Sequence, residues 1–371
     1  MLETMSTGRH YASTPYISIK YDYTIIMSLV GGTPFWLKIE AAKYSHKIIN
    51  ERCAVQPGEE VLILTDTKTE LEMSMSLAQA AAAAGARWNL LVQDAWMDES
   101  SPRILTDIAK KAVLAADLFI DVGYSLYPDV PPEYTQMMKD KKTRRMTLEC
   151  RTLRSMTGGG ADCDPKVFHD IGERIRPYVE DGEGEVHCTS SLGTDLRCNV
   201  KGARTINYTG MADKPGTSGC TPDGEFEIYP VLGSANGVIV VDGPMNHVRE
   251  STGVYGNYPW DSNYKPLKLI VEEGKYVEAI GEGGDADKFR WLIENIPNAD
   301  NFGEFALGTN PLCRETGEFS EEKKRLGNVH VAYGRGCTPA VPCNIHLDIV
   351  LRKPRVEIDG VPIIDRGKLL I

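Results

Sequence analysis

The sequence has 371 residues, 42% hydrophobic and 25% charged, which is typical of a soluble protein with two domains. Its formal net charge of −11 argues against nucleic acid or an anionic membrane surface as the main partner, because both attract a basic face. A small molecule is therefore the expected partner.

The first residues of the sequence predict neither a membrane span nor a secretory signal. The apolar run 23–30 is far shorter than the roughly 18–20 residues of a membrane span, and it lacks the features of a secretory signal. The nine cysteines include no C-x-x-C pair, which favours reduced thiols. We therefore expect a cytoplasmic protein, with residues 1–35 as an N-terminal extension.

Residues 36–180 alternate strand-like and helix-like segments, which predicts a parallel sheet in a Rossmann-like, doubly wound α/β domain. The four expected strands are residues 59–66, 87–94, 117–123 and 144–149. Thr69 and Glu72 have capping-box spacing before an Ala-rich helix. The glycine-rich segment 157–162 is not placed after the first strand as a dinucleotide fingerprint would be, so we interpret it as a connection.

Residues 181–371 predict a mainly antiparallel, β-rich (α+β) metal-binding domain with one convincing helix at 285–296. Short β segments separated by Gly, Pro and Asn are typical of such a domain. The expected strands are residues 185–190, 195–200, 226–232, 237–243, 267–283, 328–334 and 344–351.

A histidine and an aspartate lie two residues apart, at His346 and Asp348, within an otherwise apolar strand. Residues i and i+2 of a strand face the same side, so the imidazole and carboxylate project together. This pair is how many iron, manganese and zinc sites begin, although each side chain could instead have a separate structural partner.

Further nitrogen and oxygen donors occur in the same domain. His330 lies in a neighbouring β segment, and Glu304 follows a glycine beside an apolar stretch. Glu225, with Glu227 two residues on, and the pair His187 and Asp195 add more donors. Together they could hold one or two divalent ions. Neither a G-x-S-x-G elbow nor a Ser-His-Asp arrangement is evident, and Cys188 and His187, being adjacent, point to opposite faces of a strand.

Five segments carry a family resemblance: SSLGTDLRCNVKGAR, PDGEFEIYPVLGSANGVIVVDG, FGEFALGTNP, LGNVHVAYG and NIHLDIVLRKPRVEIDG. Their order resembles that of the motifs in the aminopeptidase T-type metallopeptidase superfamily. That superfamily also contains 2,5-dihydroxypyridine 5,6-dioxygenase and 5-nitroanthranilate aminohydrolase. The similarity covers roughly residues 40–365 and is strongest after residue 185.

The resemblance implies a set of metal ligands. In the peptidase branch, the positions matching Glu225, Glu304, His330, His346 and Asp348 supply a two-metal centre. In the dioxygenase, a histidine matches Glu304 and binds Fe(II) together with the His346 and Asp348 positions, so Glu304 departs from that pattern. Residues 206–216, in contrast, resemble the aromatic-substrate branch. This combination is the one associated with the aminohydrolase.

We therefore predict a hydrolase of the aminohydrolase, amidohydrolase or aminopeptidase type, which cleaves a C–N bond of a small substrate with a water activated by one or two Mn, Zn or Fe ions. An aromatic substrate is expected. The predicted ligands are Glu304, His330, His346 and Asp348. Glu225 is predicted to be the base or a bridge to a second ion, and His330 a ligand or a substrate contact. The alternatives are a mononuclear Fe(II) ring-cleaving dioxygenase and a non-enzymatic metal-binding protein.

Two expectations concern the substrate pocket and assembly. Arg335, just beyond the His330 strand, could pair with a substrate carboxylate. Tyrosines 208 and 229 and the aromatic segment 253–264 could line the pocket or belong to the core. A homo-oligomer is expected from the resemblance alone.

Overall fold

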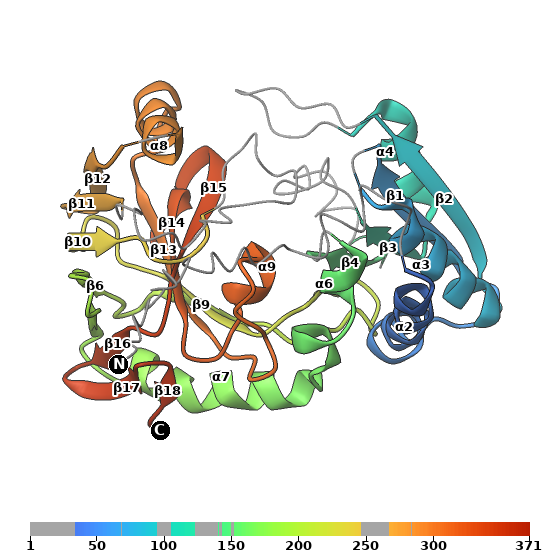
Figure 1. Cartoon of the computed structure of the whole chain (residues 1–371), viewed down its shortest axis with the longest axis horizontal. Coiled ribbons are helices and arrows are strands. Elements are labelled where there is room, and N and C mark those ends of the chain that lie inside the picture. The colour runs from blue at the N-terminus through green and yellow to red at the C-terminus, as the bar shows by residue number, and fades with distance from the viewer. Residues whose placement is uncertain are drawn as a thin grey trace, which may run out of the picture.

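The structure is a computed structural model that describes residues 34–67, 69–94, 105–122, 140, 143–149, 152–245, 267–282 and 284–371. Over these residues it contains one parallel and two antiparallel sheets (Figure 1). The predicted mixture of a parallel α/β part and an antiparallel β-rich part is thereby confirmed. Among the described residues, no helix is both long and apolar enough to cross a membrane.

The parallel sheet has five strands in the order β2-β1-β3-β4-β8. When the five strands are numbered in chain order, the sheet order is 2-1-3-4-5, the flavodoxin-like form of a doubly wound sheet. The Rossmann-like detail of the prediction is therefore not confirmed. Helices cover both faces of the sheet. The strands are β1 (Glu60–Asp66), β2 (Arg87–Gln93), β3 (Leu118–Asp121), β4 (Arg144–Leu148) and β8 (Ser218–Thr221).

The two faces of this sheet bury different helices. One face packs on α2 (Phe35–His46) and α3 (Leu71–Ala83), and the other on α4 (Asp107–Ala115). The predicted capping box is wrong, because α3 begins after Glu70 and Thr69 is engaged elsewhere. Both the backbone N–H and the hydroxyl of Thr69 donate to Oδ1 of Asp66, at 2.9 and 3.0 Å.

Two segments tie the parallel part to the β-rich part. Strand β8 comes from beyond residue 181 yet pairs with β4 in the parallel sheet. Helix α7 (Pro165–Glu180) buries Ile175 and Val179 in the core of the β-rich part and lies along its edge in Figure 1. The short α6 (Leu153–Met156) and the 3-10 turn Gly159–Asp162 lead into α7. The chain therefore crosses between the two parts more than once.

The antiparallel sheets pack face to face. The larger one has the order β12-β11-β10-β6-β5-β16-β17-β18, and the smaller one the order β15-β14-β13-β9-β7. The strands of the larger sheet are β5 (Glu185–Thr189), β6 (Asp195–Asn199), β10 (Asn236–Val240), β11 (Lys268–Glu272), β12 (Lys275–Ile280), β16 (Arg355–Ile358), β17 (Val361–Asp365) and β18 (Lys368–Leu369). Helix α8 (Gly284–Asn295) follows β12.

The smaller sheet has an apolar back face and a polar front face. Its strands are β7 (Arg204–Asn207), β9 (Glu225–Tyr229), β13 (Phe302–Gly308), β14 (Val329–Gly336) and β15 (Val341–Leu351). On the back face, Phe226, Phe305 and Val331 are fully buried against the larger sheet. Each such side chain contributes about 1.5–3 kcal/mol on burial, so this interface anchors the strands that carry the front face.

Candidate metal centre

The front face of the smaller sheet gathers all five predicted metal-site acids and histidines. Strand register places Glu227 opposite Ala306 and Ala306 opposite His330, while Glu304 is opposite Ala332, which in turn faces Asp348. Because these residues share rows across the sheet, their side chains project on the same side. The alanines between them leave room above the sheet for the longer polar side chains.

A β-bulge at Gly303 turns Glu304 toward this face. Phe302 pairs with Tyr333 and Glu304 pairs with Ala332, so Gly303 is an extra residue in β13. If Gly303 were instead paired regularly, with no bulge, strict alternation would place Glu304 on the same side as Phe302, in the apolar core. A Cβ at position 303 would lie 2.6 Å from the carbonyl oxygen of Arg335, so only glycine fits.

Glu304 lies between the two histidines. Its Oε2 is 2.9 Å from Nε2 of His346, and its Oε1 is 3.0 Å from Nε2 of His330. The Nδ1 atoms are held by backbone carbonyls, that of Arg335 at 2.7 Å for His346 and that of Lys323 at 3.2 Å for His330. A carbonyl only accepts, so each Nδ1 donates. The Nε2 atom of each ring is thereby directed at the carboxylates, as in many metal-ligating histidines.

Glu227, Glu304 and His346 form a converging triad of donor atoms. One ligand atom from each residue lies within 4.8 Å of the other two. Glu227 is 6% exposed and accepts a hydrogen bond from the hydroxyl of Tyr208 at 2.9 Å. Glu227 was not among the predicted ligands, although its position two residues after Glu225 is a same-face signal in a strand.

Several buried nitrogen and oxygen atoms of the site form ion-pair contacts but no well-directed hydrogen bond, an arrangement that suits a cation. Oε2 of Glu225, Oε2 of Glu304, Nε2 of His330 and Oδ1 of Asp348 have no well-directed hydrogen-bond partner within the described part of the chain. Buried polar atoms normally have one, and a divalent ion would engage such lone pairs. Carboxylates mixed with imidazole suit Mn, Zn or Fe. The residues therefore fit a divalent transition metal.

Burial and neighbouring charges shift the pKa values of the three triad residues in different directions. Burial raises the pKa of Glu304, but the neighbouring charge of His346 outweighs it and holds that pKa well below the usual value. Burial and the charge of Glu304 both raise the pKa of Glu227 well above its usual value. Burial opposes the charged form of His346, yet the Glu304 carboxylate raises its pKa well above 6.5. A bound cation would take the place of the proton on that imidazole.

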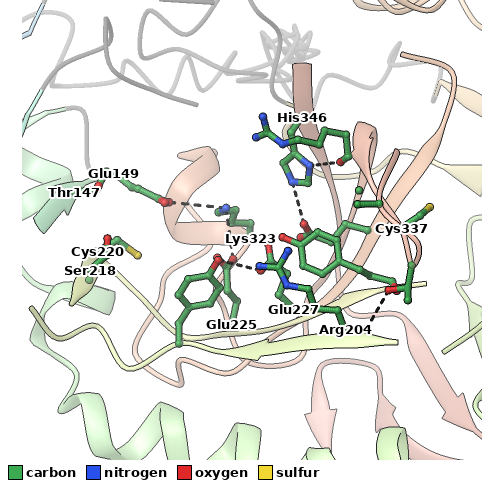
Figure 2. A pocket seen from close by; sticks show the side chains of 18 of the residues that line it. Thr147, Glu149, Arg204, Ser218, Cys220, Glu225, Glu227, Lys323, Cys337 and His346 are labelled. Carbon is green, nitrogen blue, oxygen red and sulfur yellow. Dashed lines mark hydrogen bonds and ion pairs between the residues drawn. The ribbon is translucent and has the colours of Figure 1, made fainter. Parts of the chain in front are cut away.

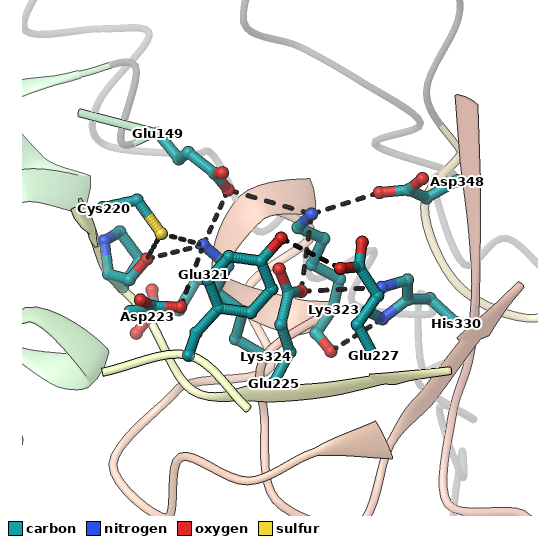
Figure 3. A network of polar contacts seen from close by, with 12 residues as sticks. Glu149, Cys220, Asp223, Glu225, Glu227, Glu321, Lys323, Lys324, His330 and Asp348 are labelled. Atoms are coloured by element: carbon teal, nitrogen blue, oxygen red, sulfur yellow. Dashed lines mark hydrogen bonds and ion pairs between the residues drawn. The ribbon is translucent and has the colours of Figure 1, made fainter. Parts of the chain in front are cut away.

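Two buried lysines complete the polar network in Figure 3. Lys323 and Lys324 directly follow α9 (Phe319–Glu322), and Nζ of Lys323 lies 3.1 Å from Oδ2 of Asp348. Burial raises the pKa of Asp348, but the Lys323 ammonium outweighs it and brings that pKa to about 2. Nζ of Lys324 lies 2.8 Å from Glu149, which follows β4 of the parallel sheet. Neither lysine was predicted, because adjacent charged residues usually indicate a solvated surface.

The triad opens into a pocket of about 470 Å³ between the parallel sheet and the front face. Tyr208, Tyr229 and Arg335 line it, together with Arg204, whose guanidinium carbon lies 4.8 Å from the centroid of the Tyr229 ring. In Figure 2 the labelled Glu227 and Arg204 both lie below His346. Residues 253–264, the predicted aromatic segment, lie outside the described residues.

The predicted donors His187 and Asp195 lie elsewhere. They are on β5 and β6 of the larger sheet, and Nε2 of His187 is 2.8 Å from Oδ1 of Asp195. Nδ1 of His187 is 3.2 Å from a guanidinium nitrogen of Arg197. These side chains pair with each other across the β5–β6 strand pair and are no part of the centre. Cys188 is buried on the opposite face of β5, as predicted.

The sequence profile of the 2,5-dihydroxypyridine 5,6-dioxygenase family matches residues 173–371, which is more than half of the chain. The chain belongs to that family. No curated protein sequence matches the chain.

Two solved structures have the same fold over most of the chain. The 2,5-dihydroxypyridine dioxygenase from Pseudomonas putida KT2440 has a TM-score of 0.69 and 18% identity, covering 90% of this chain and 97% of that one. Wild-type AmpT from Thermus thermophilus has a TM-score of 0.62 and 15% identity, covering 90% of this chain and 100% of that one. At these identities the similarity establishes the fold alone.

Proposed function

We propose that the chain is a divalent-metal-dependent hydrolase that breaks a C–N bond of a small, anionic aromatic substrate. The observation that carries this proposal is the donor set of the triad, in which two carboxylates accompany one imidazole. Ring-cleaving Fe(II) sites use two histidines and one carboxylate, whereas carboxylate-rich sets suit water activation by Mn or Zn. Glu304 is the residue that most favours a hydrolase over a dioxygenase, because its carboxylate lies between the imidazoles of His330 and His346.

The ion would be held by Glu227, Glu304 and His346, with His330 and Asp348 beside them. When bound there, it would supply a Lewis acid that makes water acidic enough to ionise near neutral pH. The protein's own groups then have to move protons and orient the substrate.

Glu225 is placed to act as the base. Its Oε2 lies 3.5 Å from Nε2 of His330 and lacks a well-directed hydrogen bond among the described residues. A carboxylate in that position can take a proton from the attacking water and return it to the departing nitrogen. The water oxygen bonds to carbon, the C–N bond breaks, and the nitrogen leaves as ammonia or an amine with the transferred proton.

The pocket favours a substrate with a negative charge and a ring. Arg204 and Arg335 line it on the side of the triad, and a guanidinium group binds a carboxylate with two parallel hydrogen bonds. Tyr208 and Tyr229 supply flat apolar surfaces for a ring. An amino-substituted aromatic acid has the ring, the anion and the C–N bond that this arrangement requires.

A ring-cleaving Fe(II) dioxygenase is the second candidate. The match to the 2,5-dihydroxypyridine 5,6-dioxygenase family favours it. His330 and His346, with Asp348 or Glu304, could supply two imidazoles and one carboxylate.

Dependence on oxygen separates the two candidates. We expect turnover of an aminobenzoate by the Mn-loaded enzyme to proceed at the same rate with and without O2, because hydrolysis consumes only water. The assay screens aminobenzoates, dipeptides and hydroxypyridines in an anaerobic chamber, follows ammonia or amine release, and uses chelator-treated enzyme as the control. Turnover restricted to hydroxypyridines, with O2 consumed in equal amount, would establish the dioxygenase instead.

Glu225→Gln is expected to retain the bound ion and lose at least about a hundredfold in turnover, as is typical for the loss of a general base. Elemental analysis and kcat measured on the best substrate of the screen test both parts. Glu185→Gln, an exposed change on β5, is the matched control. If Glu225→Gln loses the ion, Glu225 is a ligand and its role as the base is wrong.

A further inference from the structure

We propose that the ammonium group of Lys323 occupies the position of a second cation, so that the centre holds a single divalent ion. This inference rests on the metal centre proposed above. The front-face carboxylates fall into two sets. Glu227 and Glu304 converge with His346, whereas Oδ2 of Asp348 and Oε2 of Glu225 lie 3.1 and 3.5 Å from Nζ of Lys323. The other oxygen of Asp348 lies 3.3 Å from Nε2 of His346, so Asp348 borders both sets.

The second set, Glu225 and Asp348, is buried and therefore requires a nearby positive charge if both carboxylates are ionised. The side chains of Glu225 and Asp348 are only 6% and 2% exposed, and Lys323 is 4% exposed. Taking such charges out of water costs several kcal/mol each unless opposite charges meet them closely. Glu149, at 3.9 Å, is a third carboxylate around the same ammonium. Two-metal centres meet this requirement with an ion, and here a protein side chain meets it.

The backbone around Lys323 fixes the ammonium in place. The Lys323 carbonyl accepts from Nδ1 of His330, at 3.2 Å, which ties this residue to the centre at a second point. The next residue, Lys324, donates to the carbonyl of Pro222 at 2.7 Å and so holds the end of α9 against the parallel part. In Figure 3 the Lys323 side chain points between Glu149 and Asp348.

His330 lies at the boundary between the two sets. Its Nε2 is 3.0 Å from Glu304 and 3.5 Å from Glu225. Without the Lys323 charge, His330, Glu225 and Asp348 would be an unneutralised group of nitrogen and oxygen donors. Such a group suits a second divalent ion, which predicts that removing the ammonium increases the number of ions bound.

The test counts ions in the full-length protein. Wild type, Lys323→Met, Lys323→Gln and Lys323→Arg are stripped with a chelator, dialysed against Mn²⁺ and analysed for bound metal, with circular dichroism to verify folding. We expect one ion in wild type and in Lys323→Arg, and two in Lys323→Met and Lys323→Gln. The paramagnetic resonance spectrum should change from that of an isolated Mn²⁺ to that of a coupled pair. Adding Glu225→Gln to Lys323→Met should return the count to one.

The possible outcomes separate this inference from the proposed function. Two ions in wild type would overturn the inference and leave the metal enzyme standing, and this measurement needs no variant to fold. One ion in a folded Lys323→Met or Lys323→Gln protein would also overturn it. No ion in wild type would overturn the metal centre itself and the inference with it.

Discussion

Replacing His346 with alanine is expected to abolish tight binding of a divalent ion while the protein remains folded. His346 supplies the only imidazole of the triad, and its Nε2 lies 2.9 Å from Oε2 of Glu304. Loss of a group that merely orients a ligand typically costs 10–100-fold in metal affinity, so loss of a ligand should cost at least about a hundredfold. Dialysis against Mn²⁺ followed by elemental analysis measures the change.

The chain offers a matched control for this variant. His187 is another partly buried histidine with a carboxylate neighbour, Asp195, but it lies on the larger sheet. His187→Ala should bind metal as wild type does. A His346→Ala protein that retains a full equivalent of metal after dialysis would refute the site, whatever its activity.

Replacing Glu304 with glutamine is expected to lower kcat/KM by at least about a thousandfold, equivalent to about 4 kcal/mol. The substitution keeps the shape of the side chain but removes the negative charge between His330 and His346. Because Glu304 is 1% exposed, water cannot replace that charge. We therefore expect the affinity for the ion to fall, together with the negative electrostatic potential around the two imidazoles.

Kinetics on the best substrate of the anaerobic screen, with elemental analysis of the same samples, test this prediction. Glu278→Gln, an exposed glutamate on β12, serves as the control and should leave both quantities unchanged. A Glu304→Gln enzyme with kcat/KM within tenfold of wild type would exclude Glu304 as a central ligand. It would also remove the main argument for a hydrolase over a dioxygenase.

The sequence predicted the parallel strands β1 to β4 and several antiparallel strands, but it did not predict β7, β8, β13 or β16 to β18. Period-two spacing is a local property, so it placed His346 and Asp348 on one face, and the alternation of strands and helices predicted the parallel sheet. The strand order and the return of β8 to that sheet depend on tertiary pairing, which no local pattern encodes. Likewise, the sequence of α7 does not reveal that its apolar face packs against the β-rich part.

The centre also contained residues that sequence patterns could not identify. Lys323 and Lys324 lie in a charged run that is typical of an exposed helix end, and only the folded chain buries them against Glu149 and Asp348. Conversely, His187 and Asp195 gave the same kind of sequence signal as the residues of the candidate centre but belong to the other sheet. The bulge at Gly303 explains the position of Glu304, but a single glycine in the sequence is not enough to predict a bulge.

The two faces of the smaller sheet carry residues with different roles, one in core packing and the other in the pocket. Alternate positions along β9, β13, β14 and β15 either fill the sandwich interior or project into the pocket. A library that varies only the pocket-facing positions would therefore leave the hydrophobic packing intact, and new substrate preferences could be sought with little loss of thermal tolerance.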